Sequence, residues 1–457
     1  MTDIGQEQSM LRLEALANRG QKMLASLGRT WSRIWFQPST TTPLEIARIG
    51  VGSAILFHYA MATQFLFVFW GDSGWLPTDV ALLYVNVPWT QSIHFYFSAP
   101  WQWIAFHALF LFCTALFVVG WRTSWVKWIV LLGQISYDYR NLTISYGAHS
   151  ITASLLFILC LAPIGRTMSL DRVRAVRAAK LKRLDDTLPP NESPWAGACI
   201  RLMQIQMAVL FFYSGVEKIR SDDWWNGDAI WLAFNTFEFE NSPLVWLLAG
   251  QYWLVNVATY GTILLEIVYA FLIWPRPTRP YLLAAAVCLH SSFVILLGLV
   301  YFSIIMMMGH MSFLRPEWLA RLGAWWKRRI GDMEVIYDGR CGFCVRSMAW
   351  LLAHDGLHQM TIRNFRTNPS PVVADAQLEK ALYLVLPDGR ALPGFEAYRN
   401  IVLRVPGLWW LVPFFYMPVL SRLLGHPVYN WVAANRGRLS TMRIKGLTLS
   451  SRASLHP

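Results

Sequence analysis

Two sets of residues in this chain have the types and the spacing that chemistry needs. Cys341 and Cys344 form a CxxC pair, and two thiols one helical turn apart can form and break a disulfide. Lys218 and His149 lie at the ends of long apolar stretches, where an ionisable residue is costly and is for that reason a functional candidate. The first set predicts thiol–disulfide exchange, and the second predicts acid–base chemistry.

The surroundings of the CxxC pair suggest a role for each thiol. The segment Val335-Ile-Tyr-Asp-Gly-Arg-Cys-Gly-Phe-Cys reads as a strand that ends before the cysteines, and a helical pattern begins at them. The positive end of a helix dipole favours the thiolate, which is the reactive form. We therefore expect Cys341 to be the nucleophile and Cys344 to resolve a mixed disulfide, with electrostatic support from Arg340 and Arg346.

Half a zinc site is a competing interpretation, because His354 and His358 follow the cysteines. His354 lies 354 − 341 = 13 residues after Cys341, which is roughly 20 Å along one helix at about 1.5 Å per residue. The two side chains are then too far apart to share a metal, and there is no second CxxC. We therefore expect no metal site, and an inert cysteine pair remains the other alternative.

Lys218 closes the stretch Phe211-Phe-Tyr-Ser-Gly-Val-Glu-Lys, and His149 opens another. Apolar surroundings favour the neutral form of an amine, and that form can act as a general base. Trp225 belongs to an interfacial turn just after Lys218. Other ionisable residues in the apolar stretches have a structural alternative, which is packing, snorkelling or pairing with a neighbouring helix: Arg48, His58, His107, Glu266, His290 and His310.

The composition predicts the environment in which these residues lie. The chain has 457 residues, of which 55% are apolar and 15% charged, against about 45–50% and about 25% in soluble domains. These values exclude a disordered chain, a coiled coil and a simple soluble enzyme, and they indicate a polytopic membrane protein. The net charge of +13 lies in segments between apolar stretches, so we interpret it as loops on the positive side of a bilayer and expect no nucleic-acid partner.

The apolar stretches predict an α-helical bundle of about eight spans within residues 38–320. The last two stretches could be a hairpin broken near Gly298 or one long helix. Eight crossings place every basic cluster on one side of the membrane, with both termini and the CxxC pair in the cytoplasm. The polar first 10 residues predict no signal peptide, and the cysteines do not form the disulfide framework of a secreted domain. The stretches are about 44–70, 100–120, 124–139, 147–164, 196–219, 252–274, 280–298 and 300–314.

The remaining segments predict a surface helix and a second domain. Residues 1–37 read as a basic amphipathic helix on an anionic leaflet, or else as a solvated leader. Residues 331–438 read as strand, CxxC, helix, two strands and helix, which is the pattern of a small α/β redox domain. Prolines at 413 and 418 argue against a span in the aromatic segment 408–431, so we expect it to pack on this domain or on the membrane surface. Residues 439–457 read as a flexible tail.

The C-terminal domain resembles the DCC family of thiol-disulfide oxidoreductases, which is named for its D-x-x-C-x-x-C motif. The matching positions are Asp338, Cys341 and Cys344, followed by Asp388-Gly389, Pro-Gly394-Phe-Glu-Ala and the closing Tyr429-Asn-Trp-Val-Ala-Ala-Asn-Arg436. The resemblance implies a thioredoxin-like fold and a redox-active pair. It also implies supporting roles for Asp338, Arg340 and Arg436.

The membrane region, about 39–320, is similar to the HTTM domain that is shared with vitamin K-dependent γ-glutamyl carboxylase. The resemblance implies that Lys218 takes the place of the base that acts with vitamin K hydroquinone, and that His149 assists. It also makes His290, Tyr213 and Trp225 candidates for contact with a hydrophobic cofactor. The matching stretches begin at Phe69-Trp-Gly-Asp-Ser-Gly-Trp, Tyr146-Gly-Ala-His-Ser, Ala162-Pro-Ile-Gly-Arg, Gln204-Ile-Gln, Phe302-Ser-Ile-Ile-Met and Phe313-Leu-Arg-Pro-Glu-Trp.

Three functions follow from these expectations. The first is a thiol-disulfide oxidoreductase of the bacterial inner membrane, which exchanges electrons with a thiol or disulfide partner while its membrane domain holds a quinone or another hydrophobic cofactor. The second is a carboxylase-like enzyme that uses Lys218, His149 and a hydroquinone. The third is a transporter or membrane anchor with the CxxC domain as a redox sensor.

Overall fold

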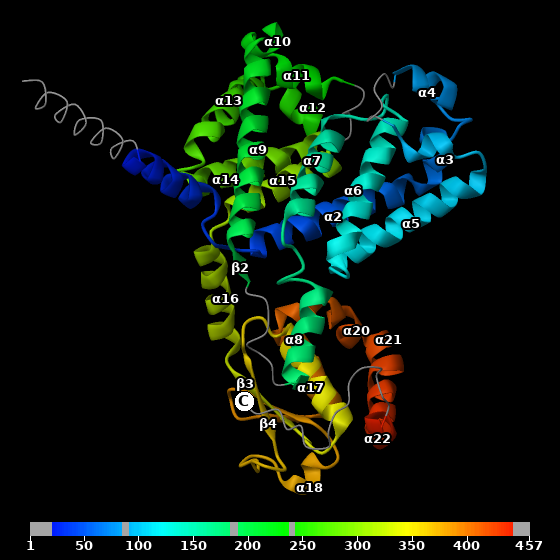
Figure 1. Cartoon of the computed structure of the whole chain (residues 1–457), viewed down its shortest axis with the longest axis vertical. Helices are drawn as coiled ribbons and strands as arrows, with labels where there is room; N and C mark the ends of the chain where they lie inside the picture. Colours follow the sequence, from blue (N-terminus) through cyan, green and yellow to red (C-terminus); the bar gives the residue numbers. More distant parts are fainter. Residues whose placement is uncertain (1–20, 85–90, 183–190, 237–242, 442–457) are drawn as a thin grey trace, which may run out of the picture. The chain divides into compact units, whose positions relative to one another are not determined.

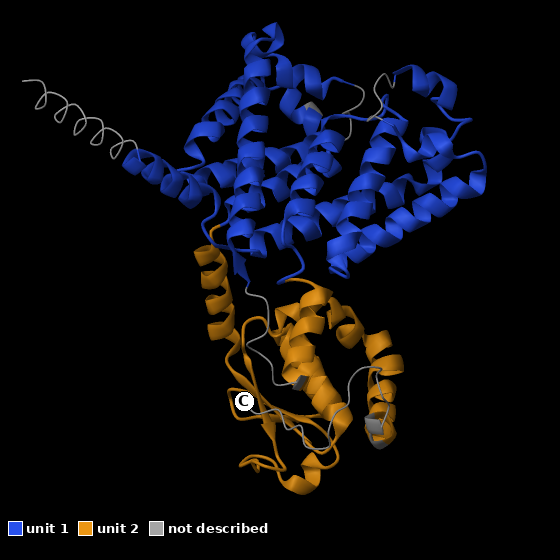
Figure 2. Ribbon diagram, viewed as in Figure 1, with its two compact units in different colours: residues 1–167, 191–314 blue, residues 168–190, 315–457 orange. Residues whose placement is uncertain are grey.

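The computed structural model describes residues 21–84, 91–182, 191–236 and 243–441, and Figure 1 shows their helices and strands, many of them labelled. The chain divides into two compact units (Figure 2). Unit 1 holds residues 1–167 and 191–314, and unit 2 holds residues 168–190 and 315–457. The apolar stretches fall in unit 1, and the CxxC pair falls in unit 2.

Each of the eight predicted apolar stretches of unit 1 contains a helix, which satisfies its own backbone polar groups as a lipid environment requires. These helices are α2 (Thr42–Ala62), α5 (Pro100–Val119), α6 (Thr123–Arg140), α7 (Gly147–Leu161), α9 (Pro194–Ile219), α13 (Tyr252–Leu272), α14 (Arg279–Leu297) and α15 (Val300–His310). Shorter elements join them: η1 (Thr63–Phe65), α3 (Leu66–Phe69), α4 (Thr78–Tyr84), η3 (Ile93–Tyr96), α10 (Asp222–Trp225), α11 (Ala229–Phe234), α12 (Pro243–Ala249) and η6 (Met311–Phe313). Strands β1 (Ser39–Thr40) and β2 (Glu192–Ser193) pair antiparallel.

Five helical segments of the described chain are long and apolar enough to cross a membrane: Thr42–Phe69, Pro100–Val119, Pro194–Ile219, Tyr252–Leu272 and Arg279–Leu297. Helices α7 and α15 are apolar but have only 15 and 11 residues, against roughly 20 for a perpendicular span. Helix α6 carries Lys127, Asp138 and Arg140 within its 18 residues. The membrane bundle is therefore supported, whereas the count of eight spans is not confirmed.

A glycine separates the last two apolar helices. Gly298 follows α14 with φ +69°, in the left-handed region, and α15 begins two residues later. Glycine is favoured at such a helix end because it has no Cβ to clash there. Residues 280–314 therefore form two helices and not one.

Unit 2 contains a four-stranded mixed sheet in the order β4-β3-β5-β6. Its strands are β3 (Met333–Tyr337), β4 (Met360–Asn364), β5 (Tyr383–Val385) and β6 (Ala391–Pro393), and the helices among them are α17 (Gly342–His354), α18 (Asp375–Leu378) and α19 (Gly394–Arg404). Strands β3 and β4 are parallel, and β5 is antiparallel to both β3 and β6. The predicted strands are thus present, and β6 was not predicted. The unit is a small α/β domain, in which the sheet, α17 and α19 enclose an apolar core.

Other helices complete unit 2. Helix α8 (Leu170–Lys182) lies between α7 and α9 in the sequence, yet it packs against α17. Helix α16 (Pro316–Ile330) precedes the sheet, and η7 (Pro406–Leu411), α20 (Val412–Tyr416), α21 (Pro418–Leu420), the π-helical turn η8 (Ser421–Gly425) and α22 (His426–Thr441) follow it. Leu408, Leu411 and Phe415 join the core of the unit, so this aromatic segment packs on the domain. Its two parts, Pro406–Tyr416 and Pro418–Arg436, are together apolar enough for a sixth span but bend by 79°.

Two predicted segments lie partly or wholly outside the described residues. Residues 21–35 are helical, whereas the start of the amphipathic helix predicted over 1–37 lies outside the described residues. The predicted tail 439–457 is described only to residue 441, where α22 ends.

Candidate active site

The CxxC pair lies where β3 leads into α17. Cys341 is the N-cap residue of this helix, and its Sγ accepts a hydrogen bond from the Cys344 backbone amide at 3.2 Å. The two cysteines form a disulfide, with their Cα atoms 5.2 Å apart. A sulfur at an N-cap lies near amides that the helix leaves without partners, and these amides stabilise a thiolate when the pair is reduced. The expected start of a helix at the cysteines is therefore present.

Asp338 holds the turn that leads to the cysteines. Its carboxylate accepts hydrogen bonds from the Arg340 amide at 2.9 Å and from the Arg366 guanidinium at 3.2 and 3.3 Å. Burial by itself raises the pKa of Asp338, but the hydrogen bonds from Arg366 and the Arg340 amide outweigh it, and the net pKa lies below the usual value. Asp338 is thus a carboxylate that positions the turn. The side chain of Arg340 is exposed, so its contribution here is the backbone amide.

Arg436 reaches the same region from α22, which lies almost a hundred residues further along the chain. Its guanidinium donates a hydrogen bond to the Glu379 carbonyl, and its charge helps to lower the pKa of Asp338. Arg346 donates to the Leu439 carbonyl at 2.6 Å. Two arginines therefore connect α22 to the segments around the CxxC pair.

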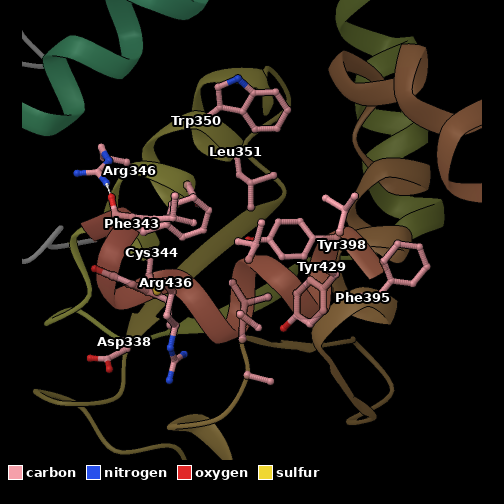
Figure 3. Close-up of a pocket in the computed structure, with 18 of the residues that line it drawn as sticks. Asp338, Phe343, Cys344, Arg346, Trp350, Leu351, Phe395, Tyr398, Tyr429 and Arg436 are labelled. Atoms are coloured by element: carbon pink, nitrogen blue, oxygen red, sulfur yellow. Dashed lines mark hydrogen bonds between the residues drawn. The ribbon is translucent and has the colours of Figure 1, made fainter. Parts of the chain in front are cut away.

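A cavity of about 640 Å³ lies next to the pair and entirely within unit 2. Cys344 and Asp338 line it, together with mostly apolar side chains from α17, α19, α20 and α22. In Figure 3, Cys344, Asp338 and Arg436 lie on one side of the cavity, and Phe395, Tyr398 and Tyr429 lie on the other. Cys341 is absent from the lining, so the two sulfurs differ in their surroundings.

Lys218 lies in unit 1 and is paired. Its Nζ donates to Ser214 Oγ at 2.6 Å and forms an ion pair with Glu266 of α13 at 2.9 Å. The ammonium also lies 5.0 Å from the centre of the Trp224 ring. The apolar surroundings expected from the sequence therefore contain a counter-ion.

His149 lies in a different group of side chains. Its ring is 5.5 Å from the ring of His58 and 5.7 Å from that of Tyr301, and its Nδ1 accepts the Tyr146 amide at 3.2 Å. His58 stacks on Tyr301 at 4.4 Å. In the described chain, no hydrogen bond or ring contact joins His149 to Lys218. His149 and Lys218 thus have different direct neighbours, and a joint role for them stays a prediction.

The three proposed cofactor contacts of unit 1 have no direct contact with one another in the described chain. His290 is buried in an aromatic cluster beside Phe211 and 5.5 Å from the ring of His310. Tyr213 is 64% exposed, and Trp225 is 60% exposed. No ring contact or hydrogen bond links these three among the residues that the structure describes. Their contact with a cofactor stays a prediction.

Two family models match the chain, one over the apolar helices and one over the domain that contains the CxxC pair. The family model of the HTTM domain matches residues 36–318, which is more than half of the chain. The chain belongs to the HTTM domain family. A second family model, the DCC1-like thiol-disulfide oxidoreductase, matches residues 335–442. Both predicted resemblances are confirmed, and the DCC1-like domain, with its CxxC pair, supports an oxidoreductase function in a membrane protein.

Among curated proteins, the chain is similar to the uncharacterized protein YitO of Bacillus subtilis, with 30% identity over 201 residues. The match covers 42% of this chain and 60% of YitO, so the chain spans less than two thirds of that relative. No solved structure matches the chain.

One contributor to the redox unit was not predicted from the sequence. Arg177 of α8 lines the cavity beside Cys344, whereas the basic run that contains it was interpreted only as a loop on the positive side of the membrane. The spacing of apolar residues along 170–182 carries little signal, because this helix is rich in arginine and lysine. The packing of α8 against α17 in the structure is what shows that Arg177 belongs to unit 2.

Proposed function

We propose that this protein is an integral-membrane thiol-disulfide oxidoreductase whose working groups are Cys341 and Cys344. The observation that carries the proposal is the N-cap position of Cys341, where the Cys344 amide donates to the sulfur. A partner disulfide reacts with the Cys341 thiolate to form a mixed disulfide, and Cys344 then displaces the partner as a thiol. The pair loses two electrons and the partner disulfide gains them. The test is reduction of a disulfide by the full-length chain, with the cysteine variants described in the Discussion.

The partner thiol or disulfide lies on the cytoplasmic side of a bacterial inner membrane in this proposal. Support comes from the distribution of charge: 166–183 and 315–329 are basic, whereas 220–251 carries Asp222, Asp223 and Asp228. An even number of crossings, eight in our count, places both termini on that side. The membrane domain would hold a quinone or another hydrophobic cofactor that exchanges electrons with the pair.

Sided thiol labelling tests this orientation. In a chain whose other four cysteines are alanine, the reduced pair is expected to be protected from a membrane-impermeant maleimide in intact spheroplasts. It is expected to be labelled after the membranes are opened. Asp223→Cys, in a variant that lacks all native cysteines, is the matched control and is expected to react in intact spheroplasts. Labelling of Cys341 and Cys344 in intact spheroplasts would contradict the cytoplasmic placement and the even number of crossings.

The carboxylase-like alternative makes a different prediction for Lys218. The ion pair with Glu266 is a specific feature of the membrane domain, and the alternative would use Lys218 as a base towards a hydroquinone. The double variant Lys218→Ala with Glu266→Gln removes both charges, so neither is left unpaired. We expect its disulfide-exchange rate to stay within about twofold of the wild type, because substitutions at sites that share no contacts usually act independently. A loss of tenfold or more, with normal folding in detergent, would favour the alternative.

A further inference from the structure

The cavity beside Cys344 has the properties of a small-molecule site. Its volume of about 640 Å³ lies within the roughly 300–1,000 Å³ of typical ligand pockets. Aromatic side chains supply much of its wall: Phe343 and Trp350 from α17, Phe395 and Tyr398 from α19, Phe415 from α20 and Tyr429 from α22. Flat rings of this kind suit an apolar, planar ligand. Polar side chains complete the lining: Asp338 and Arg436 lie on the side of the sulfur (Figure 3), and Arg177, Arg346, Ser347 and Lys380 also contribute.

The mouth of the cavity is apolar on its outside as well. Phe414, Leu424 and Val428 line the cavity, and they are also 45%, 41% and 53% exposed. Exposed apolar side chains continue from them along the same bent helix pair, at Trp410, Met417, Val419, Leu423 and Trp431. A large exposed apolar face marks a surface that something covers. In a chain with membrane-spanning helices and basic segments, the fitting cover is the bilayer surface.

These observations select one class of ligand. A molecule that enters from the bilayer is lipid-soluble, and a ligand beside a cysteine pair can take up or supply two electrons. We propose that the cavity binds a lipid-soluble quinone, and that this quinone oxidises the Cys341–Cys344 pair after a dithiol partner has reduced it, so that thiol–disulfide exchange with the partner runs in the reverse direction and the partner leaves as a disulfide. The inference rests on the proposed redox function and names the second substrate of the same pair. Arg436, with five N–H donors, is placed to hold a quinone oxygen on the sulfur side of the cavity.

The electron count of the step balances. The Cys344 thiolate attacks a ring carbon of the quinone and forms a carbon–sulfur bond. The Cys341 thiolate then attacks the sulfur of Cys344, so the disulfide forms and the carbon–sulfur bond breaks. The electron pair of that bond stays on the ring, which takes the two protons that the thiols gave up and leaves as hydroquinone. The pair has lost two electrons and two protons, and the quinone has gained them.

The different surroundings of the two sulfurs give each its own reaction. Cys344 faces the cavity and the quinone, whereas Cys341, outside the lining, meets the thiol or disulfide partner. Because the cavity lies in the same unit as the cysteines, a quinone bound there can react with Cys344 directly.

Two adjacent alanines on α22 allow a matched test. Ala433 lines the cavity, whereas Ala434 is exposed. The reduced full-length chain in nanodiscs is mixed anaerobically with decylubiquinone or, separately, with glutathione disulfide, and loss of the two thiols is followed with time. We expect Ala433→Trp to lower the ratio of the quinone rate to the glutathione-disulfide rate at least tenfold, and Ala434→Trp to leave that ratio at the wild-type value. Equal ratios in the two variants would overturn the inference.

A second variant and a measurement on the wild type keep the test decisive if Ala433→Trp misfolds. Ala381 lines the cavity from outside α22, and Ala381→Trp is expected to lower the same ratio. Oxidation of the wild-type pair by decylubiquinone that is no faster than oxidation of dithiothreitol under the same conditions would also overturn the inference. Failure of glutathione disulfide to oxidise the wild-type pair would count against the proposed function itself. Oxidation by glutathione disulfide without oxidation by the quinone would contradict only the inferred quinone site and not the proposed function.

Discussion

Cys341→Ser is expected to abolish disulfide reduction by the full-length chain, with a loss of at least roughly a thousandfold, because removal of a covalent nucleophile leaves no other group to take its place. A serine hydroxyl keeps the N-cap hydrogen bond to the Cys344 amide but does not attack a disulfide. The fold should therefore persist while the chemistry stops. The measurement is the rate of reduction of a chromogenic disulfide by the pre-reduced protein in detergent.

Cys344→Ser should give a different result. The Cys341 thiolate still attacks the substrate, but no second thiol resolves the product, so a mixed disulfide accumulates and can be identified by non-reducing electrophoresis or mass spectrometry. Cys288→Ser is the control, since Cys288 is an exposed free cysteine on α14. It is expected to leave the rate unchanged. Trapping in Cys341→Ser and not in Cys344→Ser would reverse the two roles.

The second large effect is expected at Glu45 in the membrane domain. Glu45 and Arg48 are fully buried on α2 and form an ion pair of 2.8 Å. The other carboxylate oxygen accepts the backbone amides of Gly165 and Arg166, at 2.5 and 2.9 Å. Arg48 in turn donates to the carbonyl of Val118, at 2.7 Å. One ion pair thus connects α2 to the end of α5 and to the segment after α7.

Glu45→Gln removes one charge and leaves Arg48 buried without its counter-ion. Breaking a buried pair in this way costs about 3–5 kcal/mol, so we expect a loss of that size in the free energy of unfolding in detergent. Glu217→Gln is the matched control, because the ion pair of Glu217 with Arg220 is exposed and such pairs contribute about 0–1 kcal/mol. The same unfolding midpoint for both variants would show that the pair on α2 does not stabilise the fold.

Local pattern was enough to predict the elements that carry the redox pair. The apolar run at 333–337, the cysteines that open a helix and the alternation at 361–365 are short-range features, and the structure places β3, α17 and β4 there. The apolar stretches likewise predict helices, because a run of apolar residues in lipid must satisfy its own backbone. Helix lengths were harder to predict, since apolar composition does not mark where a helix ends, and the count of eight spans stays a prediction.

Contacts between distant segments were not predictable in this way. Lys218 forms its ion pair with Glu266, which is 48 residues away, and both were recognised only as single costly residues. The cavity beside Cys344 is assembled from α17, α19, α20, η8 and α22, with Arg177 contributed by α8. No spacing within any one of these segments encodes the cavity.

The sequence by itself thus determined the chemistry that is available, the CxxC pair at a strand–helix junction beside a set of apolar helices. It did so because residue type, hydrophobic period and helix capping act over a few residues. Only the tertiary structure decided which groups meet. It paired Lys218 with Glu266, placed His149 beside His58 and Tyr301, and opened a mostly apolar cavity on the Cys344 side of the pair. The physical reason is that such contacts form between segments far apart in the chain, and local sequence patterns do not specify which distant segments pack together.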